Sequence, residues 1–416
     1  MRIIILSDLF PPRHTGGADI IAYRSAKAFQ EAGHEVMVIS TCQDLKEAGW
    51  RQVDGLKVLF LSAHRDRRLS HRLGLRPRKI LAVLEKYLKI LNPEVVQAHI
   101  IHVYFSYAVL KLCKKYCPKV FLTAHDVNIF HQGKFFSYID KKDLSRPKSF
   151  NYKLTLEEKI RQFKNTLNPF RNLIIKHYLR SANKIFAVSE ALKDALRQNG
   201  IDNVAVIYNG IEAGNIVINS RELIREKFNI GEEVKIIFMA NRFSGLKGGN
   251  LILAYIEEIK KGFDNFMVVV ASKKSGYIDN ILKQAEKKNI SRHLFFTGWL
   301  DRPDLDLLYS GCDVCLVPSI CFDSFPNNNL EAMAFKKPVV GTCFGGTPEA
   351  VVDNETGYII NPFNIKETAG KIIDLLSDEN KAKKFGEAGY QRAKNNFSLA
   401  KQLAETLRYY HEDTAD

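Results

Sequence analysis

Two carboxylates at a fixed spacing, Asp323 and Glu331, carry the clearest chemical signal in this sequence. Asp323 lies in a polar loop after an apolar run at 314–317, and Glu331 lies in the first turns of a predicted helix at 330–335. Loops at the carboxyl ends of strands in an α/β sheet are the usual place for ligands. Since a carboxylate can accept hydrogen bonds from several hydroxyl groups, the pair predicts a site for a sugar or a ribose.

Two cations, Arg242 and Lys247, open the same half of the chain. They lie in the sequence NRFSGLKGG, between a predicted strand at 235–240 and a predicted helix that begins near Gly249. Positive side chains beside a helix N-terminus favour an anion such as a pyrophosphate. They could also take the charge of a departing diphosphate, which would make a divalent metal unnecessary. The alternative is a solvated basic loop.

A glycine pair, Gly16 and Gly17, follows the first predicted strand and directly precedes a predicted helix. Glycine lets the backbone approach a ligand closely and aims N–H groups at it. The spacing is not G-x-G-x-x-G, so the evidence for a nicotinamide dinucleotide is weak. An ordinary strand-to-helix turn is the alternative.

Histidines end two predicted strands of the first half. His125 and Asp126 follow one strand in the sequence TAHD, and His99 and His102 follow the strand before it. Polar groups at the carboxyl ends of such strands are candidates for catalysis. A single histidine in this position is, however, more often structural.

Two short motifs resemble metal sites and are better explained otherwise. Asp304 and Asp306 form an Asp-x-Asp, but they begin an amphipathic helix, where acids are explained by the helix dipole. Cys312 and Cys315 form a C-x-x-C without a second pair at zinc-site spacing. Buried thiols are the preferred interpretation of that pair.

Short apolar runs alternate with helical patterns in both halves, which predicts two parallel sheets with crossover helices. In the first half the predicted strands are 3–6, 36–40, 57–61, 95–98, 120–124, 185–188 and 204–208, with helices such as 19–32 and 78–91. In the second half they are 235–240, 267–271, 294–297, 314–317, 339–341 and 358–360. The predicted fold class is α/β, with two Rossmann-like doubly wound domains.

The predicted domain boundaries follow from breaks in this alternation. A first domain at 1–210 is followed by a linker at 211–232 and a second domain at 233–396, and a last helix within 397–416 is expected to pack back toward the first domain. Residues 127–170 interrupt the first domain and are too long for an ordinary connection. We expect this insertion to contain a helical hairpin.

Length and composition limit the class of protein. A chain of 416 residues is too long for one core, and 46% hydrophobic with 26% charged residues is typical of a globular protein. No apolar run reaches the ~18 residues of a membrane-spanning helix, and the first run is broken at once by Asp8, so a buried strand is expected there and not a signal peptide. Seven cysteines at irregular spacing fit a reducing, cytoplasmic compartment.

The net charge of +15 is concentrated in the first half. Residues 1–210 hold 35 Lys and Arg against 18 Asp and Glu, whereas the remainder holds 26 against 28. Much of the excess lies in the stretches 65–79 and 134–180. A basic half of the chain can bind a nucleic acid, an anionic membrane surface or an anionic substrate. Charge alone does not choose among these partners.

The order and spacing of these motifs resemble a glycosyltransferase of family 4 with the two-domain GT-B fold, of the type that builds bacterial surface polysaccharides such as lipopolysaccharide and exopolysaccharide. The likeness covers nearly the whole chain. It rests on GGAD at 16–19, GHEV at 33–36, TAHD at 123–126, NGIE at 209–212, NRFSGLKG at 241–248, FTGWL at 296–300, PSICFDSFPNNNLEAMA at 318–334 and GGTPE at 345–349.

This resemblance implies roles for individual residues. Arg242 and Lys247 would bind the donor diphosphate, Glu331 the ribose, and Asp323 the transferred sugar. Further donor contacts would come from the backbone near the residues Gly16, Gly17, Gly298, Leu300, Phe325, Pro326 and Asn327. The acceptor would lie near Gly17, His125 and Asp126, with His125 close to the reacting sugar carbon.

The resemblance also implies a retaining transfer of a hexose-type sugar from a UDP- or GDP-sugar, with no cofactor and no metal. The leaving phosphate would help to deprotonate the acceptor hydroxyl, so no general base is assigned. This sequence departs from the family pattern at Asp323, where the family's E-x7-E pair begins with Glu. Asp is shorter by one methylene, about 1.5 Å, so donor preference is expected to depend on this position.

The acceptor is expected to be a glycan or lipid-linked acceptor at the inner face of the cytoplasmic membrane, where the basic domain could touch anionic headgroups. A basic surface that serves only solubility is the alternative. A nucleic-acid-binding protein is disfavoured because no module or stacking positions are found. A nucleotide-sugar-binding protein without catalysis, or an epimerase on the same fold, stays open as the alternative function.

Overall fold

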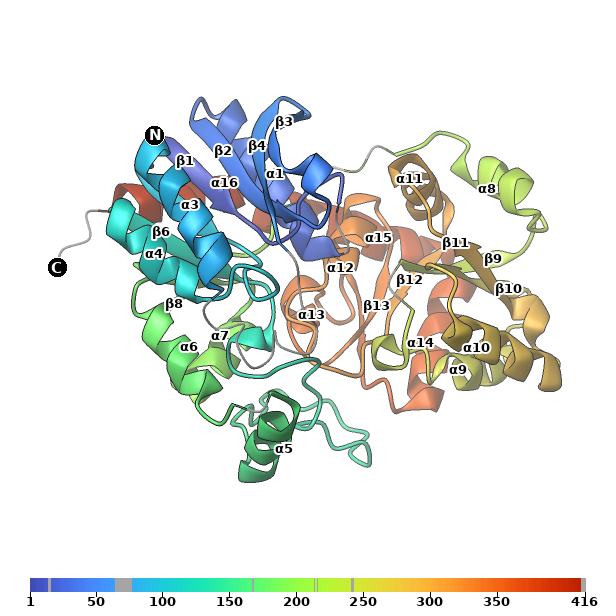
Figure 1. Ribbon diagram of the computed structural model, residues 1–416. Coiled ribbons are helices and arrows are strands. Elements are labelled where there is room, and N and C mark those ends of the chain that lie inside the picture. The colour runs from blue at the N-terminus through green and yellow to red at the C-terminus, as the bar shows by residue number, and fades with distance from the viewer. Residues whose placement is uncertain are drawn as a thin grey trace. The chain divides into compact units, whose positions relative to one another are not determined.

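The computed structural model describes residues 1–13, 16–63, 77–166, 168–212, 214, 216–240 and 243–412, with the backbone alone at 162–166. Arg242 and most of the basic stretch at 65–79 lie outside these residues. The chain forms two compact units (Figure 1). Unit 1 comprises residues 1–133, 151–210 and 399–416, and unit 2 comprises residues 134–150 and 211–398.

Unit 1 is built on an eight-stranded sheet in the order β3-β4-β2-β1-β5-β6-β7-β8. The strands are β1 (Arg2–Leu6), β2 (Glu35–Cys42), β3 (Gly49–Val53), β4 (Leu56–Ser62), β5 (Val95–Ala98), β6 (Lys119–Ala124), β7 (Lys184–Ala187) and β8 (Val204–Val206). Neighbouring strands are parallel except for β3 and β4. The central strands are buried on both faces, which explains why their sequences are continuous apolar runs.

The edge strand β3 was not among the predicted strands. Its residues are largely exposed, so its sequence lacks the apolar run that marks the inner strands. The signal that could have revealed it is the Asp54-Gly55 pair, because both residues have positive φ, as a tight two-residue hairpin requires.

Helices connect and cover the strands of unit 1. They are α1 (Gly17–Glu31), α3 (Arg78–Leu91), α4 (Ala108–Tyr116), α5 (Leu156–Thr166), α6 (Arg171–Leu179), α7 (Glu190–Gln198) and α16 (Leu399–His411), with 3-10 turns at η1 (Leu45–Glu47) and η2 (Val127–Ile129). The last helix, α16, packs against α1 (Figure 1). Its Tyr410 is fully buried and stacks on Phe29 and Phe121, with ring centroids 5.5 and 5.0 Å away. The C-terminal helix therefore completes the core of unit 1.

Unit 2 is built on a six-stranded sheet, entirely parallel, in the order β11-β10-β9-β12-β13-β14. The strands are β9 (Lys235–Ala240), β10 (Phe266–Ala271), β11 (Leu294–Gly298), β12 (Val314–Val317), β13 (Val339–Thr342) and β14 (Gly357–Ile360). The helices are α8 (Ser220–Phe228), α9 (Ile252–Lys260), α10 (Gly276–Lys287), α11 (Arg302–Gly311), α12 (Asn327–Ala334), α13 (Thr347–Ala350), α14 (Ile365–Ser377) and α15 (Glu379–Asn396), with 3-10 turns at η3 (Gly245–Lys247) and η4 (Ser291–His293). Both units thus have the predicted α/β architecture.

The segment predicted as a linker, 211–232, is part of unit 2. Its helix α8 packs on α11, where a Cβ atom on Gly311 would come within 2.4 Å of the Ile224 side chain. Arg221 of α8 also forms an ion pair of 2.6 Å with Asp313. This close packing makes α8 a fixed element of unit 2.

The predicted helical hairpin in 127–170 is wrong. The described backbone of this region has the turn η2, an irregular segment at 134–150 and a single α-helix, α5, that begins within it. Asp140 and Asp143 accept hydrogen bonds from the N–H groups two residues later, at 2.9 Å each, and such local bonds favour turns over helix. The segment 134–150 belongs to unit 2, although the sequence on both sides of it belongs to unit 1.

Within the residues that the structure describes, no helix combines the length and the apolar character needed to span a membrane.

Candidate functional site

Asp323 and Lys247 form an ion pair in unit 2. Their side chains are 16% and 19% exposed, and Asp323 also accepts a hydrogen bond from Ser319 Oγ at 3.0 Å. Burial by itself would raise the pKa of Asp323, but the charges of Lys247 and Lys134 outweigh burial and lower the pKa below its ordinary value. The two residues follow the neighbouring strands β12 and β9, whose carboxyl ends meet at one edge of the sheet.

The turn that carries Lys247 is fixed to the loop that carries Asp323. The N–H of Ile320 donates to the carbonyl of Leu246 at 3.0 Å. Gly248 has a φ of +90°, and a Cβ atom there would lie 2.5 Å from the side chain of Pro318. Only glycine fits this approach, so the glycine after Lys247 brings the two loops together.

A glycine turn holds the Asp323 backbone from the other side. The N–H of Gly346 donates to the carbonyl of Asp323 at 2.9 Å. Gly345 has a φ of +67°, and a Cβ atom there would lie 2.2 Å from the same carbonyl oxygen. The Gly-Gly pair of the GGTPE motif is therefore a support for the Asp323 loop.

Glu331 lies in α12, where both of its carboxylate oxygens have partners. Arg302 Nη1 donates to one oxygen at 3.2 Å, and the hydroxyl of Tyr309 donates to the other at 3.0 Å. Both partners come from α11, and sequence reasoning missed them because they precede Glu331 by more than 20 residues.

The Asp-x-Asp motif at Asp304 and Asp306 is paired with cations of the chain. Arg302 also binds Asp306 at 2.7 Å, and Asp304 pairs with Lys227.

The other predicted donor residues lie at loop ends of unit 2. Phe325 is buried and Pro326 caps the start of α12 at Asn327. Asn328, which was not predicted, donates to the carbonyl of Ala240 and so joins the start of α12 to the end of β9.

Gly298 ends β11 with a φ of +83°, and a Cβ atom there would meet nothing within 4 Å. Leu300 follows two residues later and is half-buried. Between them, Trp299 is 57% exposed, and the ammonium of Lys273 lies 4.6 Å from the centre of its ring. An exposed indole at the carboxyl edge of a sheet is a suitable surface for a nucleobase.

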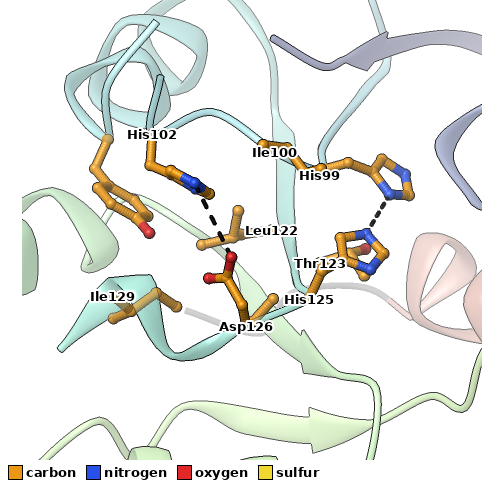
Figure 2. A pocket seen from close by; sticks show the side chains of 10 residues that line it. His99, Ile100, His102, Leu122, Thr123, His125, Asp126 and Ile129 are labelled. Carbon is orange, nitrogen blue, oxygen red and sulfur yellow. Dashed lines mark hydrogen bonds and ion pairs between the residues drawn. The ribbon is translucent and has the colours of Figure 1, made fainter. Parts of the chain in front are cut away.

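Four of the predicted polar residues of unit 1 lie around one small pocket (Figure 2). The rings of His99 and His125 stack with centroids 5.2 Å apart, and His99 Nδ1 lies 3.0 Å from His125 Nε2. Across the pocket, His102 Nε2 lies 4.0 Å from a carboxylate oxygen of Asp126. The carboxyl ends of β5 and β6 therefore bring His99, His102, His125 and Asp126 together, as expected for loops that follow neighbouring strands.

Asp8 organises the loop that carries His102, a role that sequence reasoning missed. Its buried carboxylate accepts hydrogen bonds from the N–H groups of Val103, Tyr104 and Phe105 at 2.5, 2.9 and 2.9 Å. Burial raises the pKa of Asp8 to about 6, although His102 and these N–H groups act in the opposite direction. The available signal was a carboxylate two residues after the apolar run of β1.

We expect His125 to be neutral throughout the physiological range. Burial lowers its pKa from 6.5 to about 4, an effect that His102 reinforces and Asp126 opposes. The unfolded chain protonates this histidine near its ordinary pKa, so its contribution to stability declines as the pH falls from 6.5 toward 4. An NMR titration of the ring, assigned with the His125→Gln variant, should show a midpoint near 4. A midpoint near 6.5 would contradict the buried environment.

Gly16 and Gly17 form the start of α1. Gly17 is the first residue of the helix, and the N–H of Gly16 donates to the carboxylate of Asp19 at 3.2 Å in a capping arrangement. This cap explains the aspartate of the GGAD motif. The predicted contact between the backbone of Gly16 and Gly17 and a ligand stays a prediction.

Among the described residues, neither the cysteine pair nor any cluster of acidic side chains has the form of a metal site. Cys312 and Cys315 are buried thiols with sulfurs 3.6 Å apart, and burial raises the pKa of Cys315. Groups of three or more His, Cys, Asp or Glu side chains placed to hold an ion are absent from the part of the chain that the structure covers.

Two family models match this chain. The model described as "Glycosyltransferase Family 4" matches residues 15–214, and the model described as "Glycosyl transferases group 1" matches residues 220–392.

Similar proteins include an uncharacterized glycosyltransferase of Methanocaldococcus jannaschii, 25% identical over 388 residues, which cover 91% of this chain and 90% of that protein. A second one from that organism is 26% identical over 255 residues, covering 60% and 64%. A GDP-mannose-dependent alpha-(1-6)-phosphatidylinositol monomannoside mannosyltransferase of Mycobacterium tuberculosis is 25% identical over 198 residues, covering 45% and 51%. The match thus spans less than two thirds of the length of the last two relatives.

Solved structures share the fold over the whole chain. Sucrose-phosphate synthase from Thermosynechococcus elongatus superposes with a TM-score of 0.75 at 17% identity, covering 98% of each chain. The Anabaena protein HepE in complex with UDP superposes with a TM-score of 0.70 at 17% identity, covering 98% of this chain and 100% of that chain.

Proposed function

The chain belongs to glycosyltransferase family 4, and we propose that it moves a hexose-type sugar from a UDP- or GDP-sugar to a hydroxyl group of a glycan or lipid-linked acceptor. Its fold is the predicted GT-B fold. The observation that carries the proposal is the placement of Lys247, Asp323 and Glu331 on loops and a helix at the carboxyl edge of one parallel sheet. Both a diphosphate and sugar hydroxyls find suitable partners in this set.

The donor diphosphate binds to Lys247 and to Arg242, which lies outside the described residues. Lys247 is paired with Asp323 in the structure, so a diphosphate must compete with that carboxylate for the ammonium group. A doubly charged phosphate in a partly buried site is the stronger partner. Once Lys247 has turned to the phosphate, the Asp323 carboxylate is available to sugar hydroxyls.

Glu331 binds the ribose hydroxyls of the nucleotide. Each carboxylate oxygen has two lone pairs, so Glu331 can accept from the ribose while it keeps Arg302 and Tyr309. These two donors hold the carboxylate in one orientation before the ligand arrives, which reduces the ordering that binding requires. Trp299 and the backbone near Gly298 and Leu300 lie at the same edge and offer a surface for the base.

The transfer retains the anomeric configuration and requires no metal. The charge that builds on the departing diphosphate is stabilised by the cations of the chain, and the leaving phosphate accepts the proton of the acceptor hydroxyl. His125, neutral at physiological pH, contributes a hydrogen bond near the reacting carbon and carries no charge. The protein's main task is therefore to align the two substrates and to neutralise charge.

The acceptor binds to unit 1 and is attached to a lipid or carried on a glycan at the inner face of the membrane, where the enzyme is peripheral. Support comes from the mycobacterial relative, whose name includes the glycolipid phosphatidylinositol monomannoside. Further support comes from exposed side chains in and around α5 and α6. Leu156, Ile160, Phe170 and Leu173 are each at least 48% exposed, and Lys153 and Lys159 are exposed in the same part of the sequence. Such surfaces favour anionic lipid.

A transfer assay tests the reaction. UDP- and GDP-sugars should be offered one at a time with lipid-linked glycan acceptors, with and without EDTA, and the anomeric configuration of the product read by NMR. We expect transfer from one nucleotide class, unaffected by EDTA, with the α-linked donor giving an α-linked product. Epimerised donor without transfer, or binding without turnover, would instead favour an epimerase or a non-catalytic sugar-binding protein.

Co-sedimentation with liposomes tests the membrane claim separately. At low salt the protein should sediment with vesicles that contain phosphatidylglycerol more than with neutral vesicles of phosphatidylcholine. Equal sedimentation with both would remove the proposed peripheral location.

A further inference from the structure

We infer that Lys134 is a positioning residue of the donor site, which keeps Asp323 ionised and in place when the donor diphosphate takes Lys247. This inference rests on the proposed function. Lys134 begins the segment 134–150, which we call the strap. The sequence places the strap between β6 and β7 of unit 1, but the strap is part of unit 2.

The far end of the strap is fixed by a network of polar contacts. The guanidinium of Arg146 donates to the Asp353 carboxylate at 2.7 Å and to the carbonyl of Ile359 at 2.8 Å. The side-chain amide of Asn361 donates to the carbonyls of Asp143 and Ser145 at 2.8 and 2.6 Å. These contacts are made to the edge of the sheet at β14, so the strap has a defined position on unit 2.

Aromatic packing continues from this anchor toward the Asp323 loop. Tyr138 lies edge-on to Phe322 and Phe344, with ring centroids 6.1 and 6.4 Å away. Phe150 packs on Phe344 at 5.8 Å, and Phe135 packs on Phe322 at 6.4 Å. Phe322 directly precedes Asp323, so the strap covers the base of the loop that bears the carboxylate.

A backbone hydrogen bond completes the link. The N–H of Phe322 donates to the carbonyl of Phe135 at 2.7 Å. The residues next to this pair are Asp323 on one side and Lys134 on the other. Lys134 is therefore tied to the Asp323 loop through the main chain, while its own side chain stays exposed to solvent.

The charges around Asp323 explain why a second cation is useful. Among the residues that the structure describes, the groups that act on its carboxylate are Lys247, Lys134 and Ser319. The thiol of Cys321 lies nearby, and burial together with the Asp323 charge raises its pKa. When Lys247 turns to a phosphate, Lys134 is the cation that remains with Asp323 among these groups. Without it, a nearly buried carboxylate would keep, of these described groups, the Ser319 hydroxyl as its partner, and so would hold Lys247 back from the diphosphate.

The test is a charge series at this position. Isothermal titration calorimetry with UDP and with GDP should be carried out on the wild type and on Lys134→Arg, Lys134→Gln and Lys134→Glu. For the nucleotide that binds, we expect Lys134→Gln to weaken binding about three- to fivefold and Lys134→Glu more than tenfold, since an exposed charge acts on a carboxylate that is itself nearly buried. Lys134→Arg should bind with the wild-type affinity, because arginine keeps the positive charge. If Lys134 only filled space, the charge of the replacing residue would make no difference.

Lys148→Ala is the matched control, because Lys148 is an exposed lysine in the same strap; it should bind as the wild type does. A second variant, Arg146→Ala, tests the anchor. It should weaken binding as Lys134→Gln does, and the double variant should lose less than the product of the two effects, since both act through one contact. Equal affinities of wild type and Lys134→Glu would overturn this inference alone, whereas a wild type that binds neither diphosphate would overturn the proposed function as well.

Discussion

The Lys247→Ala variant should lose sugar transfer by a factor of about 10²–10³ while it stays folded. The ammonium group is the described cation best placed to receive the charge of the departing diphosphate, and that charge is greatest in the transition state. Removing it should therefore lower kcat more than it raises the donor KM. The variant also leaves Asp323 without its ion-pair partner, which adds repulsion between the carboxylate and the incoming phosphates.

The measurement is steady-state transfer with the preferred nucleotide sugar, combined with circular dichroism and thermal unfolding. Lys261→Ala is a suitable control, because Lys261 is 68% exposed and forms an ion pair with its near neighbour Glu258 on the surface of unit 2. The control should transfer sugar at the wild-type rate. Near-normal turnover of Lys247→Ala would mean that the diphosphate binds elsewhere.

The Gly345→Ala variant should lower kcat/KM for the donor at least a hundredfold. A side chain at this position meets two obstacles: a positive φ of +67°, and a carbonyl oxygen of Asp323 only 2.2 Å from the new Cβ atom. The backbone oxygen cannot rotate away as a side chain could, so the Asp323 loop must shift. A displacement of about 1 Å in a positioning group is enough for an effect of this size.

Gly370→Ala provides the comparison for this variant. Gly370 lies in α14, and a Cβ atom there would meet nothing within 4 Å. Alanine should be tolerated or should stabilise the helix by up to about 1 kcal/mol. Donor kinetics and the thermal unfolding midpoint should be measured for both variants. Equal kinetics of Gly345→Ala and the wild type would show that the Asp323 loop does not position the donor.

The fold was predictable wherever a strand is buried on both faces. Runs such as Ile3–Leu6 and Val314–Val317 are continuous and apolar because helices cover both sides of a parallel sheet. The strand β3 escaped prediction because it is an exposed edge with a polar sequence. The position of a strand in the sheet thus decides how visible it is in the sequence.

The candidate site was predictable in its chemistry but not in its supports. Asp323, Glu331 and Lys247 were found because charged side chains follow strand ends at short spacing. Arg302, Asp8 and the strap were not found, because their contacts join residues that are distant in the sequence. Local patterns reveal side chains that emerge from regular elements, whereas long-range packing has no local signature.

The strap also shows why the predicted hairpin failed. The aromatic residues Phe135, Tyr138 and Phe150 lie in the insertion that the sequence pattern assigned to the first domain, but they pack on residues of unit 2. Nothing in a single sequence reveals which core an aromatic residue joins when the chain passes from one unit to another and back.

A structure of the protein crystallised with UDP or with GDP tests the central claim most directly. We predict that the diphosphate lies within hydrogen-bond distance of Lys247 Nζ, that the ribose hydroxyls bind Glu331, and that Lys247 has left Asp323. A nucleotide bound away from the carboxyl edge of the unit 2 sheet, or one bound there while Lys247 stays paired with Asp323, would contradict this account.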